Sequence, residues 1–495
     1  MSLLVGEVLR RAAALSGNSV GASLESDQAT FAQLDQRANQ AAQVLSGLGV
    51  GGGARLASWT DISLRCLDVF FGAARSGAAY APLNPAFSVA EAADVVAYLA
   101  PRALLVDGPH LEAGDEVAQQ LGVPLLVTGG RPGGFDFDRA TEQASPSTPE
   151  LPPPEARDPH VIFLTSGSTG RPKGVVLSHY ASWMRSVPTG GATRLQASGG
   201  GGEVCMFPLF HMAGWHSVLC SWSLLRPIHF VPRADGDRLL AEVARWRASQ
   251  LYCIPAVWQR AFTSMQRYDL SSLRYALTGT SLVTQDLLHE LKERLPGTET
   301  TVSYGSTEMG VVTSLGDYDL FRKPESIGLP NPSFEVAIID GELCVRGETA
   351  MSGYLDLPEE TAAAFAGGWY HSGDLADMDD EGYLRITGRR SEIIRSGGET
   401  VAPGEVEAAL VTYPGLRDVA VVGVPDETWG EIVCAVVVTD DGCPAPSSAE
   451  IRGYLEGRLA GFKHPRRVER VVSIPRTPAT GQIQRARVRQ TILGS

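Results

Sequence analysis

Hydrophobic and polar positions alternate with two different periods along most of the chain. Short apolar runs such as ALLVD (103–107) and PLLVT (124–128) are typical of buried strands. Between such runs lie stretches whose apolar residues are three or four positions apart, as in residues 30–50. The apolar positions on one face of that helical stretch are Leu34, Ala38, Ala41 and Leu45. Thr30 and Gln33 fit a capping box at its start. Strands that alternate with helices predict an α/β fold with parallel sheets flanked by helices.

The pattern changes after about residue 330, where strands follow one another directly. The runs EVAIID and GELCVRG meet at Asp340 and Gly341, and an Asp-Gly pair in this position is a strong hairpin signal. Two further runs, VAVVGV (419–424) and IVCAVVV (432–438), predict strands near the C-terminus. A helix is expected after them, with its apolar face formed by Ile451, Leu455 and Leu459.

These changes predict two domains. Residues 1–387 are expected to form a large N-terminal domain of stacked βα sheets with a small β-barrel-like part. Residues 388–495 are expected to form a small α+β C-terminal domain, joined at the segment ITGRRSE (386–392). The proline-rich stretch 145–159 cannot pack as a helix or a sheet, so it predicts a surface connector within the large domain.

Composition narrows the class of protein without naming a function. Of 495 residues, 44% are hydrophobic and 20% are charged, which is ordinary for a soluble globular protein. The net charge of −14 provides no general field to attract nucleic acid or an anionic membrane, and no apolar run is long enough to span a bilayer. Seven scattered cysteines without a CxxC pair favour a reducing compartment over a disulfide framework or a zinc site. Arg10 and Arg11 interrupt the first apolar stretch, which does not fit a signal peptide, and we expect a cytoplasmic protein.

One segment carries the strongest chemical signal, VIFLTSGSTGRPKGVVLSH (161–179). An apolar strand leads into a stretch rich in glycine and hydroxyl groups, followed by Lys173 and a second apolar strand. The residues able to approach or donate to a ligand are Gly167, Gly170 and Gly174, with Thr165, Ser166, Ser168 and Thr169. Glycines let backbone N–H groups approach phosphate oxygens, and hydroxyls and an ammonium add to the binding. The segment is not a Walker A loop, because Lys173 precedes glycine and a strand follows. A flexible surface loop is the plain alternative, which the two bracketing strands disfavour.

Six further motifs follow this loop in order. They are FPLFHMAGW (207–215), SYGSTE (303–308), GELCVRGETAMSGY (341–354), WYHSGDL (369–375), GRRSEIIRSGGETVAPGEVE (388–407) and PRTPATGQIQR (475–485). In order and spacing, the seven segments resemble the adenylate-forming superfamily of acyl-CoA synthetases, peptide-synthetase adenylation domains and luciferases. The resemblance extends over nearly the whole chain, and a series of seven matches is far more specific than any one of them.

The resemblance implies an enzyme that activates a carboxylic acid with ATP and Mg²⁺, releases pyrophosphate and passes the acyl group to coenzyme A. A carboxylate and a triphosphate are both anions, so catalysis is mainly positioning and charge neutralisation. The family exchanges its two active faces by rotating the C-terminal domain, so residues 388–495 are expected to be a mobile lid that completes both half-reaction sites.

The resemblance also implies a nucleotide site. Its residues are Thr165, Ser166, Gly167, Ser168, Thr169, Gly170, Lys173, Gly279, Thr280, Ser303, Tyr304, Gly305, Ser306, Thr307, Asp374 and Arg389. Tyr304 is expected near adenine, Thr307 at the α-phosphate, and Asp374 and Arg389 at the ribose. Glu308 is expected to bind Mg²⁺, which suits a cation that takes few protein oxygens. The catalytic set implied is Lys173, His211, Thr307, Glu308 and the position of Gln482.

The acid and coenzyme A sites follow from the same motifs. The residues expected to line the acyl pocket are His211, Met212, Trp215, Tyr304 and Met309. Ordinary core packing explains several of these almost as well. The motifs contain no charged side chain placed to pair with a second charged group on the substrate. This favours a fatty or aryl acid over an amino acid. The residues that resemble coenzyme A contacts are Gly397, Gly398, Trp429, Phe462, His464 and Arg466.

Position 482 departs from the family, which has a catalytic lysine there. Glutamine donates hydrogen bonds but brings no charge, and losing one charged transition-state contact commonly costs about 10²–10³-fold in rate. Adenylation is therefore expected to be impaired, and thioester formation less so. Three explanations stay open: a deliberate replacement, which the intact motif favours; a naturally slow enzyme; and substitution by a cation such as Arg485 or Arg487. Ser391 is a second departure, at the hinge, where the family has Asp or Lys.

Two other functions stay open. One is an acid:AMP ligase that hands its acyl group to a carrier protein, against which Trp429 argues modestly. The other is a nucleotide- or acyl-CoA-binding pseudoenzyme, which Gln482 supports. The sequence does not decide the oligomeric state, and a homodimer is compatible with it.

Overall fold

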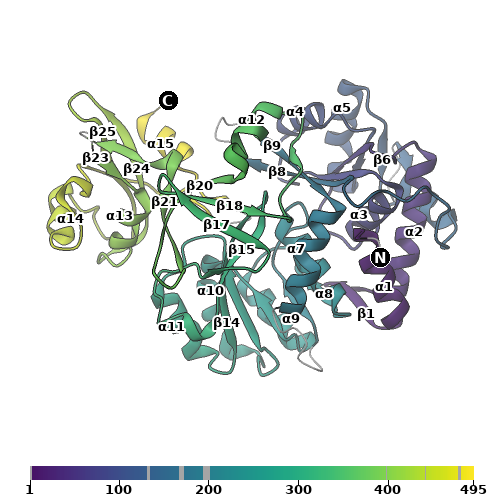
Figure 1. The fold of residues 1–495 in the computed structure, drawn as a ribbon, viewed down its shortest axis with the longest axis horizontal. Coiled ribbons are helices and arrows are strands. Elements are labelled where there is room, and N and C mark those ends of the chain that lie inside the picture. Colours follow the sequence, from purple (N-terminus) through teal and green to yellow (C-terminus); the bar gives the residue numbers. More distant parts are fainter. Residues whose placement is uncertain are drawn as a thin grey trace.

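Two large sheets make up most of the chain up to residue 354 (Figure 1). The structure is a computed structural model that describes residues 3–130, 134–166, 172–192, 201–396, 399–440, 442–477 and 481–494. Across the first sheet the described strands are β16 (Leu329–Pro330), β15 (Gly310–Leu315), β14 (Glu299–Ser306), β13 (Tyr275–Gly279), β12 (Gln250–Tyr252), β10 (Glu203–Cys205), β11 (Ile228–Phe230), β1 (Val20–Leu24) and β2 (Asp27–Thr30). Across the second they are β19 (Gly353–Tyr354), β9 (Pro172–Ser178), β8 (Pro159–Ser166), β4 (Ala79–Pro82), β3 (Arg55–Trp59), β5 (Ala103–Val106), β6 (Leu125–Val127) and β7 (Phe135–Asp136).

The centre of each large sheet is parallel, as the alternating pattern predicted. Antiparallel strands are added at the edges, where β2 pairs with β1, β15 with β14, and β9 with β8. The helices around these sheets are α1 (Val5–Ser16), α2 (Phe31–Gly47), α3 (Arg65–Ser76), α4 (Val89–Leu99), α5 (Leu111–Leu121), α6 (Phe137–Gln143), α7 (His179–Ala192), α8 (Met212–Ser223), α9 (Gly236–Trp246), α10 (Pro255–Phe262), α11 (Gln285–Arg294) and α12 (Pro358–Ala364). Residues 144–158 form no helix or strand, but Pro159 already belongs to β8, so the proline-rich connector predicted at 145–159 ends one residue earlier.

Aromatic side chains join the helices to the first sheet. Trp222 of α8 is fully buried, with its ring 5.8 Å from that of Phe31 and 5.1 Å from that of Phe71. Its indole N–H donates to the carbonyl of Gly21 in β1 at 2.9 Å. One residue therefore ties α2, α3, α8 and a strand together, and the polar end of its large ring is satisfied as burial requires.

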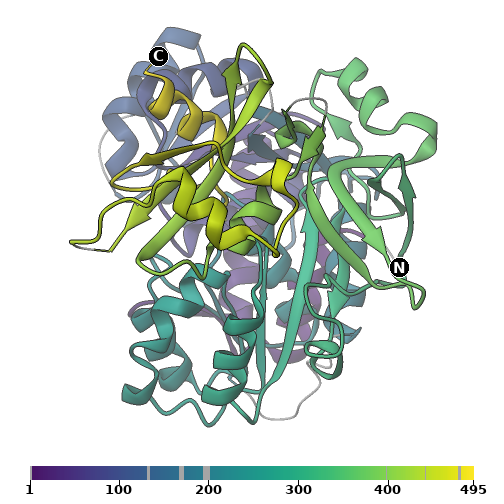
Figure 2. The ribbon, with the colours of Figure 1, turned by 90° about the vertical axis from the view of Figure 1, so that its left-hand side faces the viewer.

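Two smaller sheets follow. The third is antiparallel, in the order β17 (Phe334–Ile339), β18 (Glu342–Gly347), β20 (Tyr370–Met378) and β21 (Leu384–Arg389). The fourth holds β23 (Glu399–Val401), β22 (Ile394–Ser396), β25 (Gly430–Thr439), β24 (Leu416–Asp426) and β26 (Arg467–Arg470). Its helices are α13 (Pro403–Leu410), α14 (Ser448–Leu455) and α15 (Arg485–Leu493). This last part lies at one end of the molecule, at the left of Figure 1 and toward the viewer in Figure 2.

Two local predictions are confirmed and one is corrected. The hairpin forms at Asp340 and Gly341, both with positive φ (49° and 78°), which matches the turn that an Asp-Gly pair favours. The strands at 419–424 and 432–438 form and pair as β24 and β25. The predicted C-terminal helix is shorter than its periodicity suggested, because α14 ends at Leu455 and Gly457 adopts φ 75°. Leu459 still packs on the same core, but from the turn that follows.

Within the described residues, no helix combines the length and apolar composition needed to cross a bilayer. All seven cysteines are free, and six of them are buried. This agrees with the expectation that they form no disulfide framework.

The start of α2 provides a test of the local folding rules. Gln33 N–H donates to the Thr30 hydroxyl at 3.2 Å, and Thr30 N–H donates to the Gln33 side chain at 2.9 Å, so the predicted capping box is complete. We expect Thr30→Ala to lower the free energy of unfolding by about 1 kcal/mol, because a backbone N–H of the first turn loses its acceptor. Urea denaturation followed by circular dichroism measures this loss. The matched control is Thr263→Ala, whose hydroxyl donates within the exposed end of α10 and caps no N–H. A change there beyond about 0.5 kcal/mol, or none at Thr30, would contradict the assignment.

Candidate active site

The predicted phosphate loop joins two paired strands. Thr165 of β8 lies opposite Lys173 of β9, and the Thr165 hydroxyl donates to the Lys173 carbonyl at 3.3 Å. The Lys173 ammonium lies 4.9 Å from the centre of the Tyr354 ring, within range of a cation–π contact. Gly174 is closely packed, since an added Cβ would lie 3.0 Å from Ile162 and 3.1 Å from Leu355. The phosphate contacts predicted for Gly167, Ser168, Thr169 and Gly170, and for the Ser166 side chain, lie outside the described residues.

Three of the predicted nucleotide residues meet at one carboxylate. The Tyr304 hydroxyl of β14 donates to Asp374 Oδ2 at 2.6 Å, and Arg389 Nε pairs with Asp374 Oδ1 at 2.8 Å. Asp374 and Arg389 are direct partners across β20 and β21, whereas Tyr304 comes from the first large sheet. Asp374 is only 5% exposed, and burial raises its pKa while the charge of Arg389 opposes the rise. The structure therefore brings these residues together as a buried, paired carboxylate.

The segment before Asp374 is anchored by a carboxylate that the sequence analysis missed. Gly373, with φ 74°, donates its N–H to Glu342 Oε1 at 2.8 Å. Glu342 Oε2 accepts from Arg390 at 2.9 Å and lies 3.0 Å from His371 Nδ1. Glu342, Cys344 and His371 lie close enough to hold a metal ion, but the Arg390 cation already occupies that oxygen. Glu342 therefore anchors the turn at Gly373. In the sequence, the one feature that could have indicated this role is that Glu342 is a charged residue in a largely apolar strand.

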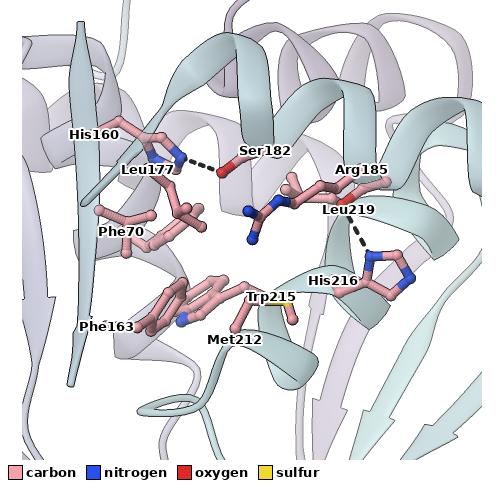
Figure 3. Close-up of a pocket in the computed structure, with 12 residues that line it drawn as sticks. Phe70, His160, Phe163, Leu177, Ser182, Arg185, Met212, Trp215, His216 and Leu219 are labelled. Atoms are coloured by element: carbon pink, nitrogen blue, oxygen red, sulfur yellow. Dashed lines mark hydrogen bonds between the residues drawn. The ribbon is translucent and has the colours of Figure 1, made fainter. Parts of the chain in front are cut away.

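A buried arginine, also missed, holds the SYGSTE segment. Arg185 of α7 donates from Nη1 to the Thr307 carbonyl at 2.7 Å and from Nη2 to the Glu308 carbonyl at 2.5 Å. Its Nε donates to the Thr349 carbonyl at 2.7 Å. Burial lowers the pKa of Arg185 to about 9, so the guanidinium still carries its charge at neutral pH. Figure 3 shows the group pointing from α7 into a small cavity.

The Glu308 carboxylate, predicted to bind Mg²⁺, makes one hydrogen bond within the described residues. Its Oε1 accepts from the Tyr354 hydroxyl at 3.1 Å, and its backbone carbonyl accepts from Met351 N–H at 2.7 Å. An ionised carboxylate has further acceptor capacity beyond one hydrogen bond. The residues present therefore fit a Mg²⁺ ion bound by one carboxylate, with substrate phosphates and water as its other ligands.

The adenine-side loop contacts the C-terminal segment that carries position 482. Gly279 lies against β14, because an added Cβ would be 2.1 Å from the Ser303 carbonyl, and Thr280 adopts φ 65°. Gln482 Nε2 donates to the Thr280 carbonyl at 3.1 Å. Arg485, one of the cations considered as a substitute, is paired with Glu392 and Glu407 of the C-terminal part.

The predicted acyl-pocket residues divide into two groups. Met212 and Trp215 line the cavity in Figure 3, whose volume of about 10 Å³ is enough for a single water. Trp215 stacks on Phe70 at 3.6 Å between ring centres, so it is also a core residue. His211 accepts a long hydrogen bond from Ala213 N–H at the start of α8, and burial lowers its pKa to about 4. The residues of the prediction that do not line this cavity are His211, Tyr304 and Met309.

The predicted coenzyme A residues are partly brought together. The Arg466 guanidinium lies 4.1 Å from the centre of the Trp429 ring, which is 40% exposed. Phe462 is also exposed, whereas His464 Nε2 lies 2.9 Å from the Leu459 carbonyl and is held by it. Gly397 and Gly398 lie outside the described residues.

Comparison with known protein families decides the identity of the chain. The AMP-binding enzyme family matches residues 9–355, and the AMP-binding enzyme C-terminal domain matches residues 405–480. The chain belongs to the AMP-binding enzyme family. A long-chain-fatty-acid–CoA ligase, FadD13 of Mycobacterium tuberculosis (strain ATCC 25618 / H37Rv), is 30% identical over 93% of this chain and 92% of its own length. The 3-[(3aS,4S,7aS)-7a-methyl-1,5-dioxo-octahydro-1H-inden-4-yl]propanoyl:CoA ligase of Rhodococcus jostii (strain RHA1) is 34% identical over 95% of each chain.

Solved structures agree with this assignment over the full length of the chain. ATP-bound MatB from Rhodopseudomonas palustris superposes with a TM-score of 0.90 at 27% identity, covering 99% of each chain. The anthranilate CoA ligase AuaEII in complex with anthranoyl-AMP gives a TM-score of 0.87 at 25% identity, covering 99% of this chain and 97% of its own. The fold is that of the adenylate-forming enzymes, and the chain is an acid–thiol ligase.

Glu342 provides the test of how the turn before Asp374 is held. Glu342→Gln keeps the shape of the side chain but turns an acceptor of three hydrogen bonds into a neutral amide. We expect the free energy of unfolding to fall by about 1.5–3 kcal/mol, the range for hydrogen bonds to a charged group. The control is Glu335→Gln on neighbouring β17, whose exposed carboxylate pairs with Arg346 and should contribute less than about 1 kcal/mol. Equal urea midpoints for the two variants would show that Glu342 anchors nothing.

Proposed function

We propose that the protein activates a fatty or aryl carboxylic acid with ATP, giving acyl-AMP and pyrophosphate, and then transfers the acyl group to coenzyme A. The observation that carries this proposal is the buried Asp374 carboxylate held by Tyr304 and Arg389. An ionised carboxylate can accept from both hydroxyls of a ribose. The full-length similarity to coenzyme A ligases and to an ATP-bound structure supports the same reading.

The reaction has two balanced steps. An oxygen of the substrate carboxylate attacks the α-phosphorus of ATP, and the bond from that phosphorus to pyrophosphate breaks. The thiol of coenzyme A then attacks the acyl carbonyl, loses its proton, and displaces AMP. Both steps place anions together, so the enzyme contributes mainly orientation and positive charge.

The residues are assigned to these steps as follows. Asp374 and Arg389 orient the ribose, Thr307 contacts the α-phosphate, and Lys173 with the loop before it binds the outer phosphates. Glu308 would hold Mg²⁺, which supplies charge neutralisation on the phosphates when bound. The side chains nearest the acid are those of the FPLFHMAGW motif, with His211 neutral because burial lowers its pKa to about 4.

The names of related proteins support a fatty or aryl acid. One relative is named as a ligase of long-chain fatty acids and another as a ligase of a fused-ring propanoyl group. The structure of AuaEII was solved with anthranoyl-AMP. All three acids present a large apolar surface.

Coenzyme A is the favoured acceptor, and a carrier protein is the alternative. The exposed Trp429 ring under Arg466 offers a flat surface and a cation for a nucleotide end of the acceptor. The other alternative, a binding protein without catalysis, is favoured only by the neutral residue at position 482.

The test of the proposed function is pyrophosphate release with a panel of acids, followed by thioester formation. We expect release with fatty or aryl acids, and product formation when coenzyme A is added. Asp374→Asn should weaken ATP binding by roughly 10–100-fold, because hydrogen bonds to a charged group contribute about 1.5–3 kcal/mol. The control is Asp377→Asn on the same strand, whose exposed carboxylate pairs with Arg385. Undiminished ATP binding by Asp374→Asn would refute the assigned site.

The role of position 482 has its own test. Gln482→Lys should raise ATP–pyrophosphate exchange by at least about tenfold, a conservative share of one charged transition-state contact. The rate of thioester formation from supplied acyl-AMP should change less. Gln484→Lys adds the same charge two positions away and should leave exchange within about twofold. An exchange rate that Gln482→Lys does not change would discredit the role assigned to this position.

A further inference from the structure

We propose that Arg185 is a positioning residue of the adenylation half-reaction, which holds the peptide groups of Thr307 and Glu308 so that these residues face the phosphates and Mg²⁺. The inference rests on the proposed function, because the roles of Thr307 and Glu308 belong to it. Arg185 acts through these two residues and is not assigned a contact with substrate.

The first support is the hydrogen-bond geometry. One planar guanidinium donates to three backbone carbonyls, those of Thr307, Glu308 and Thr349, at 2.5–2.7 Å. The Thr349 hydroxyl in turn donates to the Met309 carbonyl at 2.8 Å. Because the donors of a guanidinium have a fixed fork geometry, these bonds set the direction of the carbonyls as well as their distance.

The consequence for the site follows from the planarity of the peptide. In a trans peptide the C=O and the next N–H point in opposite directions. With the Thr307 carbonyl turned toward α7, the N–H of Glu308 points away from α7. A hydrogen bond from a cation to the carbonyl also polarises the peptide, which makes that N–H a stronger donor to an anion. The neighbouring N–H, of Met309, is occupied by the Ser306 hydroxyl at 3.2 Å.

A second, separate observation is the space left for the arginine. Gly310, at the start of β15, has φ 90°, and an added Cβ would lie 3.0 Å from Arg185 Cγ and 3.1 Å from Cδ. Gly310, two positions after Glu308, therefore has no side chain to crowd the stem of Arg185. The stem of Arg185 packs against Gly310, while its guanidinium binds the carbonyls of Thr307 and Glu308.

The experiment compares Arg185→Met and Arg185→Lys with Arg75→Met. Arg75 is a matched control, because it is also a buried arginine, paired with Asp35 and Asn39 between α2 and α3 and away from the site. The readouts are the ATP–pyrophosphate exchange rate, the Mg²⁺ concentration at half-maximal exchange, and thioester formation from supplied acyl-AMP. Exchange uses the acid that is most active in the panel above.

We expect Arg185→Met to lower the maximal exchange rate at least about tenfold and to raise the half-saturating Mg²⁺ concentration by about tenfold, as loss of an outer-shell partner does. Thioester formation should stay within about threefold. Arg185→Lys should recover part of the loss, since it keeps the charge but not the fork. Arg75→Met should lower the thermal midpoint and leave the Mg²⁺ dependence of the folded enzyme unchanged.

Each outcome bears on the proposal. If Arg185→Met alters Mg²⁺ dependence no more than Arg75→Met, or slows both half-reactions equally, the proposal is overturned. If Arg185→Met does not fold, Arg185→Lys replaces it in the comparison with Arg75→Met and should show a smaller Mg²⁺ shift in the same direction. A wild-type protein that neither binds ATP nor exchanges pyrophosphate overturns the proposed function itself, whereas an active wild type with unaffected variants overturns only the role of Arg185.

Discussion

The ion pair between Asp374 and Arg389, with the Tyr304 hydroxyl as a third partner, is the interaction on which the candidate site depends. A carboxylate removed from water is strongly unfavourable unless it is paired and hydrogen-bonded. Tyr304 belongs to the first large sheet, whereas Asp374 and Arg389 belong to the third. The ion pair itself forms within the third sheet, and the Tyr304 hydrogen bond is added only when the first sheet packs against it.

Polar groups behind the site extend the same principle to the backbone. Glu342 fixes the N–H of Gly373, and Arg185 fixes the carbonyls of Thr307 and Glu308. In each case a charged side chain that is itself held by the fold determines the direction of a peptide group next to a proposed ligand contact. A loop organised in this way presents its donors without reorganisation, which is the main means of stabilising charge in a transition state.

Position 482, where the resemblance to the family places a catalytic lysine, carries a neutral glutamine. Its amide reaches the Thr280 carbonyl, so the C-terminal segment is in contact with the adenine-side loop. Arg485 is committed to Glu392 and Glu407, which disfavours it as a substitute cation in this arrangement of the chain. Under the proposed function, positive charge for adenylation then comes from Lys173 and from a Mg²⁺ ion at Glu308, whose backbone carbonyl accepts from Arg185.

The sequence by itself determined the features that depend on neighbouring residues. The capping box at Thr30 and the Asp-Gly hairpin at 340–341 form as predicted, because their hydrogen bonds and turn angles involve residues at most a few positions apart. The order of seven motifs identified the family, and the meeting of Asp374 with Arg389 followed from that resemblance. The helix after β25 was predicted too long, because periodicity alone does not show that the backbone turns to an extended conformation at Glu456.

Only the tertiary structure decided which buried charges support the site. Arg185 and Thr307 are 122 positions apart, and nothing near Arg185 in the sequence distinguishes it from a surface arginine. In the sequence, Glu342 is likewise only a charged residue in a largely apolar strand. In the folded protein, Gly373 and Arg390 lie beside it and donate to its carboxylate. The physical reason is that a hydrogen bond between distant residues exists only after the sheets have packed, so its partners are set by the fold and not by spacing along the chain.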